Sequence, residues 1–129
     1  MAGALSGTAV LVADDDAESL DVIEDVIAEQ GATVRSATNA REALELLRTW
    51  RPDIILLDIA MPEMDGYDLL ATIRRQPSLC AIPAIAVTGH GYARDKQRAK
   101  DVGFAKHITK PVDIDTLVHV IAELVPAVP

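Results

Sequence analysis

The stretch Asp53-Ile54-Ile55-Leu56-Leu57-Asp58, residues 53–58, is the most apolar strand candidate of the chain, and it ends on an acid. A continuous apolar run is typical of a strand that is covered on both faces, as in a parallel sheet. Pro52 precedes the run, and Met61-Pro62-Glu63-Met64-Asp65-Gly66 follows it with the composition of a turn. We therefore expect a central strand that carries Asp58 to its carboxyl end.

Outward from this strand, short apolar runs alternate with amphipathic segments along the chain. This alternation predicts βα units and an α/β fold around a parallel sheet. We expect strands over residues 8–13, 32–36, 53–57, 84–87 and 105–108. The second of them is the weakest and is expected at an edge of the sheet.

Polar residues mark where the intervening helices begin. Asp16 is the expected cap of the first helix, and Asn39 with Glu42 forms a capping-box pair at the start of a helix that runs to about residue 50. The helix expected over residues 93–102 has little apolar surface to bury and should be loosely held. Asp113 should cap the last helix, whose inward residues are expected to be Ile114, Leu117, Val118, Ile121 and Leu124.

Length and composition limit the classes of protein. The 129 residues fit one domain, residues 1–129, with its core over about residues 8–125. A net charge of −8 argues against nucleic acid or an anionic membrane surface as the main partner. The single Cys80 cannot form an internal disulfide, which points to a reducing, cytoplasmic compartment. No run approaches the roughly 20 apolar residues of a membrane span, and residues 1–8 lack the features of an export signal.

The residues that end the expected strands form a small chemical set. In an open parallel α/β sheet the functional crevice lies beyond the carboxyl ends of the strands. Asp14 and Asp15 follow the first strand, Asp58 ends the third, Thr88 follows the fourth, and Lys110 comes shortly after the fifth. If the first and third strands are neighbours, three carboxylates converge, and their repulsion predicts a hard cation, with Mg²⁺ as the natural choice.

Such a set is suited to chemistry on a phosphoryl group. A carboxylate beside a metal ion can be the nucleophile and form an aspartyl-phosphate, and Asp58 is best placed for this role. The Lys110 ammonium would face one phosphoryl oxygen, and the Thr88 hydroxyl would donate to another.

Taken together, these motifs resemble the receiver domain of two-component response regulators, over essentially the whole chain. The motifs are Asp14-Asp15, Pro52 to Asp58 followed by Met61 to Gly66, Val87-Thr88-Gly89, and Lys110-Pro111. The resemblance implies the flavodoxin-like (βα)5 fold, a doubly wound parallel sheet in strand order 2-1-3-4-5. It also implies that a histidine kinase or a histidine phosphotransfer protein donates the phosphoryl group.

The same resemblance assigns the metal-binding residues and the phosphoacceptor. Asp58 is implied to accept the phosphoryl group. Mg²⁺ is implied to be held by Asp58, by Asp15 as the principal ligand, by Asp14 through water, and by the backbone carbonyl of Ala60.

Three further residues match the family positions that act on or respond to the phosphoryl group. Thr88 and Lys110 match the positions that contact it, and the Lys110-Pro111 bond resembles a cis peptide that orients the lysine. His107 stands at the switch position, where the family often has Tyr or Phe. The implied switch draws Thr88 inward and alters the surface formed by residues 93–102, 105–108 and the last helix. That surface would bind another partner, and it is a candidate for homodimer formation.

Two side chains flank the path by which water would attack the acyl phosphate. They are Ala60, two residues after Asp58, and His90, two residues after Thr88. We expect these two side chains to set the lifetime of the phosphoryl group.

Two other functions stay open at this point. Asp14-x-Asp16 after an apolar strand matches the nucleophile and acid of haloacid-dehalogenase-type phosphatases, although this assignment leaves residues 58–66 unexplained. A receiver that works without phosphate, as a docking scaffold, is the other. The runs Val87 to Tyr92 and Gly103 to Asp113 resemble receivers of hybrid sensor histidine kinases. The chain is expected to be a stand-alone receiver or one from a larger protein, and this resemblance favours the receiver of a hybrid kinase.

Overall fold

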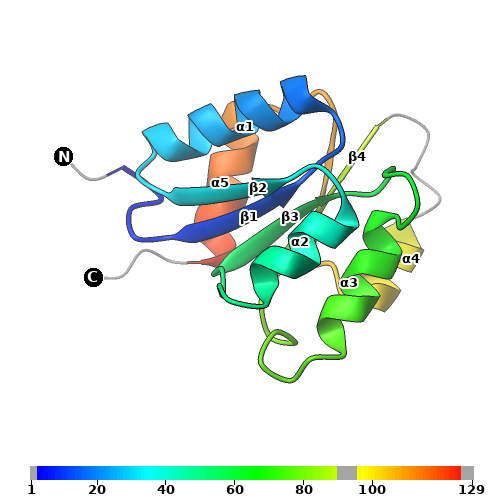
Figure 1. The fold of residues 1–129 in the computed structure, drawn as a ribbon. Coiled ribbons are helices and arrows are strands. Elements are labelled where there is room, and N and C mark those ends of the chain that lie inside the picture. Colours follow the sequence, from blue (N-terminus) through cyan, green and yellow to red (C-terminus); the bar gives the residue numbers. More distant parts are fainter. Residues whose placement is uncertain (1–2, 90–95, 126–129) are drawn as a thin grey trace.

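The structure is a computed structural model that describes residues 3–89 and 96–125. Within these ranges strands and helices alternate along the chain (Figure 1). The strands are β1 (Ala9–Ala13), β2 (Thr33–Ala37), β3 (Ile54–Asp58), β4 (Ala84–Thr88) and β5 (Lys106–Thr109). The helices are α1 (Ala17–Glu29), α2 (Ala40–Leu47), α3 (Gly66–Arg74), α4 (Lys96–Val102) and α5 (Ile114–Leu124). The expected alternation is confirmed, and each strand boundary lies within about one residue of its predicted position.

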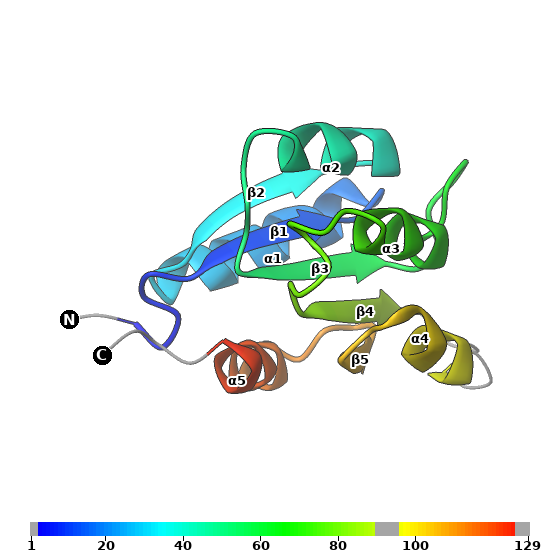
Figure 2. The same cartoon turned by 90° about the horizontal axis from the view of Figure 1, so that it is seen from below.

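The strands pair in parallel in the order β2-β1-β3-β4-β5 over the described residues. This order confirms the doubly wound, flavodoxin-like fold, with β3 at the centre and β2 at an edge. The strand arrowheads point to the same edge of the sheet (Figure 2). Ala13 of β1 stands opposite Leu57 of β3, so the acids that follow these residues leave the sheet side by side.

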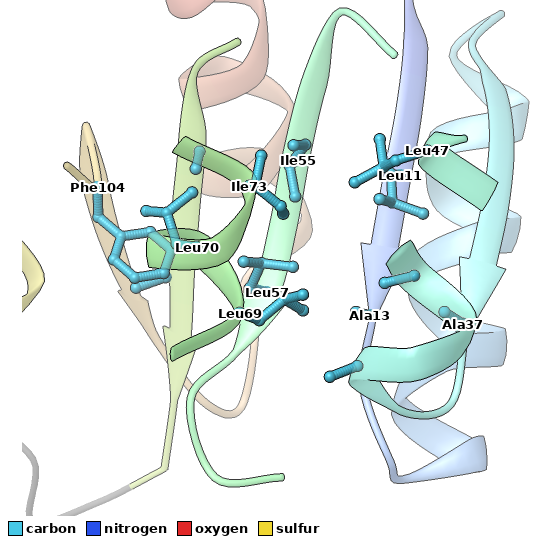
Figure 3. Packing of buried hydrophobic residues seen from close by; sticks show 14 of the residues in the cluster. Leu11, Ala13, Ala37, Leu47, Ile55, Leu57, Leu69, Leu70, Ile73 and Phe104 are labelled. Carbon is cyan, nitrogen blue, oxygen red and sulfur yellow. The ribbon is translucent and has the colours of Figure 1, made fainter. Parts of the chain in front are cut away.

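Helices cover both faces of the sheet, with α1 and α5 on one face and α2, α3 and α4 on the other (Figures 1 and 2). Successive strand residues point to opposite faces, so β3 gives Ile55 and Leu57 to the α3 side and Ile54 and Leu56 to the α1 side. All four side chains are fully buried, and each such burial is worth about 1.5–3 kcal/mol. Figure 3 shows the α3-side cluster, in which Leu69, Leu70 and Ile73 pack over β3. No helix of the described residues is long and apolar enough to cross a membrane.

A segment before β1 adds to the core on the α1 face. Leu5 is fully buried. Its N–H donates to the Gln30 carbonyl just past the end of α1, at 2.9 Å. The sequence does not predict Leu5 in the core, because one apolar residue among small ones forms no periodic pattern.

The first two helices begin as expected, and the second ends earlier than expected. The Asp16 side chain caps α1, and the Asn39 side chain caps α2. The expected end of α2 at about residue 50 was wrong, since the helix ends at Leu47. The N–H groups of Arg48 and Thr49 donate to carbonyls three residues back, which tightens the last turn into a 3₁₀ form.

The last helix differs from expectation in its first turn. Ile114 was expected inward because it shares the helical spacing of the buried Leu117 and Ile121, but it is 46% exposed in the first turn of α5. Asp113 stands at the cap position, but its carboxylate accepts from the Thr116 hydroxyl at 2.7 Å instead of from a backbone N–H.

Among the described side chains of helix α4, Arg98 contacts α3, and the partly buried Val102 packs against the α3-side cluster. Arg98 Cζ lies 4.3 Å from the centroid of the Tyr67 ring, and Arg98 Nη2 lies 4.0 Å from Asp68 Oδ1. The Tyr67 ring packs edge-on against Phe104, which follows α4, with 6.4 Å between centroids. Most described side chains of α4 are exposed, in agreement with its small apolar surface.

The loop after β3 returns closely to the strand end at Gly66. The Gly66 N–H donates to the Ile59 carbonyl at 3.0 Å. A Cβ at residue 66 would lie 2.6 Å from the Asp58 carbonyl oxygen and 2.9 Å from Ile59 Cα. Only glycine permits this approach, so Gly66 lets α3 begin directly against the end of β3.

Gly66→Ala is expected to destabilise the fold by about 2 kcal/mol or more, because the backbone at Asp58 and Ile59 would have to move away from the methyl group. Gly89→Ala is the matched control, since a Cβ at Gly89 meets no atom of the described residues within 4 Å. Urea unfolding followed by circular dichroism measures both variants. An equal loss of stability in the two would contradict the close approach at Gly66.

Candidate functional site

The carboxyl edge of the sheet gathers the residues that the sequence singled out. Asp14 follows β1, Asp58 ends β3, Thr88 ends β4 and Lys110 follows β5. Asp14 is 1% exposed, Asp58 5% and Thr88 1%, whereas Asp15 is exposed. The site therefore combines two buried acids with one that faces solvent.

Three carboxylates approach one another at this edge. One oxygen from each of Asp14, Asp15 and Asp58 lies within 4.8 Å of the others. Backbone N–H groups hold two of them, because the Asp16 N–H donates to Asp14 Oδ1 at 2.9 Å and the Ala60 N–H donates to Asp58 Oδ1 at 3.1 Å. The convergence expected from neighbouring first and third strands is observed.

Lys110 supplies positive charge to this cluster. Its Nζ lies 2.9 Å from Asp14 Oδ2 and 3.4 Å from Asp58 Oδ2. The contact with Asp58 has hydrogen-bond geometry, but the contact with Asp14 does not, so Asp14 Oδ2 is buried without a hydrogen bond among the described residues. Burial acts to lower the Lys110 pKa, but the two carboxylates together outweigh it and raise that pKa. The Lys110-Pro111 bond is cis, as the resemblance implied.

The carboxyl group of Asp58 is perturbed by its surroundings. Burial is the largest cause that raises its pKa, from 3.8 to about 7, and the charge of Asp14 is the second. Lys110 and the Ala60 N–H act in the opposite direction without cancelling the effect. In the metal-free protein, the negative charge of this cluster exceeds what Lys110 compensates.

This donor set fits Mg²⁺. Carboxylate oxygens are the ligands that this cation prefers, and it keeps several waters on its open side. Asp14 Oδ2 is a buried oxygen that lacks a hydrogen bond in the described part of the chain, and Asp15 lies on the solvent side. The residues that could hold the ion are Asp14, Asp15 and Asp58. The carbonyl of Ala60 stays a prediction from the resemblance.

The two expected switch residues are in direct contact. Thr88 Oγ1 and His107 Nε2 share a hydrogen bond of 2.7 Å. Both residues were expected at the switch from the resemblance, but their contact was not expected. The β4–β5 register, which sets Ala86 opposite His107, brings the ring diagonally beside Thr88. His90, the other residue expected to affect phosphoryl lifetime, lies outside the described residues.

Comparisons with known proteins agree with this site. The family model of the response regulator receiver domain matches residues 10–122. The chain is 39% identical over 120 residues to an uncharacterized 14.6 kDa protein in the sodA1 3' region of Leptolyngbya boryana, covering 93% of this chain and 92% of that protein. It is 31% identical over 112 residues to the polar-differentiation response regulator DivK of Brucella anthropi, covering 87% and 91%.

A solved structure of a receiver domain is also similar to this chain. The signal receiver domain of a signal transduction histidine kinase from Syntrophus aciditrophicus has a TM-score of 0.85 and 32% identity to this chain, covering 95% of this chain and 96% of that one. Other curated relatives are longer, and the chain spans from 14% to 56% of their length.

In the metal-free protein, Asp58→Asn is expected to raise stability at about pH 8. The folded-state pKa is raised from 3.8 to about 7, so the folded protein binds a proton that the unfolded chain has released, and stability falls as the pH rises through this window. Ionisation of Asp58 in the folded protein therefore lowers the free energy of unfolding above about pH 7.

Thermal unfolding in EDTA at about pH 4.5 and about pH 8 measures this effect, and the gain should be larger at the higher pH. The control is Asp25→Asn, which removes one exposed negative charge from α1. Gains of equal size in the two variants at about pH 8 would contradict the perturbed state of Asp58.

Proposed function

Because the chain belongs to the response regulator receiver domain family, we propose that it is a phospho-accepting receiver of a two-component or phosphorelay system. Asp58 takes a phosphoryl group from a phosphohistidine in a reaction that needs Mg²⁺. The observation that carries this proposal is the setting of Asp58, which is 5% exposed at the end of the central strand, with Lys110 Nζ 3.4 Å away. Such a carboxylate is fixed in place and faces the cation that a phosphoryl oxygen would need.

The transfer step uses this chain's residues in separate roles. A carboxylate oxygen of Asp58 attacks phosphorus and forms the P–O bond, while the N–P bond of the donor breaks and its electron pair stays on the imidazole nitrogen. Lys110 stabilises charge on one phosphoryl oxygen, and the Thr88 hydroxyl donates to another. Later attack by water returns the free Asp58 carboxylate and inorganic phosphate. Beyond accepting and losing phosphate, the isolated domain has no proposed enzymatic activity.

The carboxylates that surround Asp58 would serve the same step. Asp14, Asp15 and Asp58, with the backbone carbonyl of Ala60, would hold Mg²⁺, which when bound supplies positive charge against the phosphoryl oxygens. Asp14 lies beside Lys110 and would keep the ammonium directed at the acceptor.

A groove beside Lys110 supports a protein as the phosphoryl donor. Its volume is about 290 Å³, and its walls come from α1 and from the segment after β5, including Val22 and Pro111. Val22 is 56% exposed, and an exposed apolar side chain beside a reactive group suits a partner that covers it. The proposed partner is a histidine kinase or a histidine phosphotransfer protein. The likeness to a histidine kinase's receiver supports a hybrid kinase as the parent.

Phosphorylation is proposed to alter the surface formed by α4, β5 and α5, where an output partner or a second copy of the chain would bind. The net charge of −8 disfavours nucleic acid and anionic membranes as partners of this domain. The cytoplasm, which the single Cys80 favours, is the proposed compartment.

The haloacid-dehalogenase-type alternative fits the geometry less well. Asp14, its nucleophile, is buried beside Lys110 as Asp58 is, so the residue that separates the two assignments is the acid. Asp16, its acid, accepts from the Glu18 N–H at 3.2 Å and from the Ser19 hydroxyl at 2.9 Å, so its carboxylate serves as a helix cap. These contacts favour Asp58 as the nucleophile.

After incubation with Mg²⁺ and acetyl phosphate or phosphoramidate, the wild type is expected to gain the mass of one phosphoryl group. Asp14→Asn should gain the same mass in a smaller fraction of molecules, and Asp58→Asn should gain none. Intact-mass spectrometry reads the adduct. Loss of the adduct in Asp14→Asn with retention in Asp58→Asn would favour the dehalogenase-type phosphatase. No adduct with either donor would favour the phosphate-independent scaffold.

Ala60→Leu is expected to slow loss of the phosphoryl group several-fold, because Ala60 is small, exposed and two residues beyond Asp58, where a larger side chain would obstruct water. His90→Ala tests the second side chain, whose role rests on the sequence. The control is Ala28→Leu, at an exposed position near the end of α1. Release of phosphate from the purified phosphoprotein gives the rates, and equal rates in all variants would remove both residues from the proposal.

A further inference from the structure

The Thr88 hydroxyl can donate only one hydrogen bond, and acceptors for it can stand on both neighbouring strands. Strand β4 lies between β3 and β5, so Asp58 stands on one neighbouring strand and His107 on the other. On the β5 side, Thr88 Oγ1 is already 2.7 Å from His107 Nε2. A phosphoryl group on Asp58 would place a second set of acceptors on the β3 side.

The direction of the Thr88–His107 hydrogen bond follows from burial. An imidazole nitrogen accepts or donates according to its tautomer. Thr88 is 1% exposed, and this is the hydrogen bond that its hydroxyl makes among the described residues. A buried donor without an acceptor is costly, whereas an oxygen with an unused lone pair costs less. The favoured arrangement therefore has the Thr88 hydroxyl donating to Nε2.

We propose that His107 is a positioning residue that competes with the Asp58-bound phosphoryl group for the Thr88 hydroxyl and thereby weakens retention of that group. This inference rests on the proposed receiver function and adds the identity of the competing acceptor. To donate to a phosphoryl oxygen, the hydroxyl must turn away from Nε2 and give up its present bond. The O–H bond stays intact, and only the acceptor changes.

The competition depends on the chemistry of the residue at position 107. A Phe ring has no lone pair for the hydroxyl, and so it would leave Thr88 without this acceptor. A Gln amide can accept through its oxygen at a similar reach. The two substitutions therefore separate loss of the acceptor from loss of the imidazole ring.

Beryllofluoride with Mg²⁺ is the probe, since it mimics a phosphoryl group on a carboxylate without turnover. His107→Phe is expected to bind it about three- to tenfold more tightly than the wild type, as one competing hydrogen bond is removed. His107→Gln should lie closer to the wild type than His107→Phe does. His119→Phe is the control, because the His119 side chain is 80% exposed on α5. Equal affinities of the wild type and His107→Phe would overturn the competition.

A double-mutant cycle shows whether the effect passes through the hydroxyl. In a Thr88→Val background, His107→Phe should change the affinity by less than about twofold. A change as large as in the Thr88 background would mean that the ring acts through packing, and it would overturn the proposal.

Imidazole nitrogen shifts measured by ¹⁵N NMR test the direction of the bond in the free protein. Nε2 of His107 is expected to be unprotonated and to lose its hydrogen-bond shift when beryllofluoride binds. A proton on Nε2 in the free protein would overturn the proposal. If beryllofluoride binds no variant, the proposed receiver function fails, while the shifts of the free protein still decide the direction of the bond.

Discussion

The repulsion between the Asp14 and Asp58 carboxylates organises the rest of this site. It arises from strand order, since β1 and β3 are neighbours and Ala13 stands opposite Leu57. Two buried acids at this spacing cannot both ionise cheaply. Lys110 arrives from a third strand end and lies 2.9 Å from one acid and 3.4 Å from the other. The Asp58 pKa of about 7 reflects burial first and the charge of Asp14 second, which Lys110 only partly offsets. The folded chain thus keeps negative charge that Lys110 does not neutralise, at the edge of the sheet where a cation would bind.

The backbone around Asp58 keeps this arrangement rigid. The Ala60 N–H donates to Asp58 Oδ1, and the Ile59 carbonyl accepts from the N–H groups of Met61 and Gly66. Because Gly66 carries no Cβ, α3 can begin against the strand end and hold the loop there. The acceptor is therefore fixed by main-chain contacts. Any response to a group bound on it has to come from side chains on the neighbouring strands.

Sequence patterns predicted the strands and the residues at the carboxyl edge, because apolar runs and the acids that end them are local signals. The strand order was implied only by the resemblance to the receiver family, and the structure confirms it. Sequence patterns failed where packing is decided between distant segments. Leu5 is buried against α1, and Ile114 is exposed although it has the helical spacing of an inward residue. The contact of Thr88 with His107 joins two strands, and it follows only once the β4–β5 register is known. A one-residue slip of that register would turn His107 to the other face.

The side of the sheet that carries β5 and α4 is where a conformational change costs least. A switch needs an element whose two arrangements differ by a few kcal/mol. At β3 the side chains are fully buried on both faces, so displacement would lose several apolar contacts at once. At α4, Arg98 makes a cation–π contact with Tyr67 and an exposed ion pair with Asp68, each worth about 1 kcal/mol or less, and Val102 is only partly buried. His107 lies half-buried on β5, which pairs with β4 at the edge of the described sheet. If the Thr88 hydroxyl exchanges one hydrogen-bond acceptor for another, the free energy involved is comparable with that of the contacts that hold α4. The exchange is therefore large enough to alter how α4 is held.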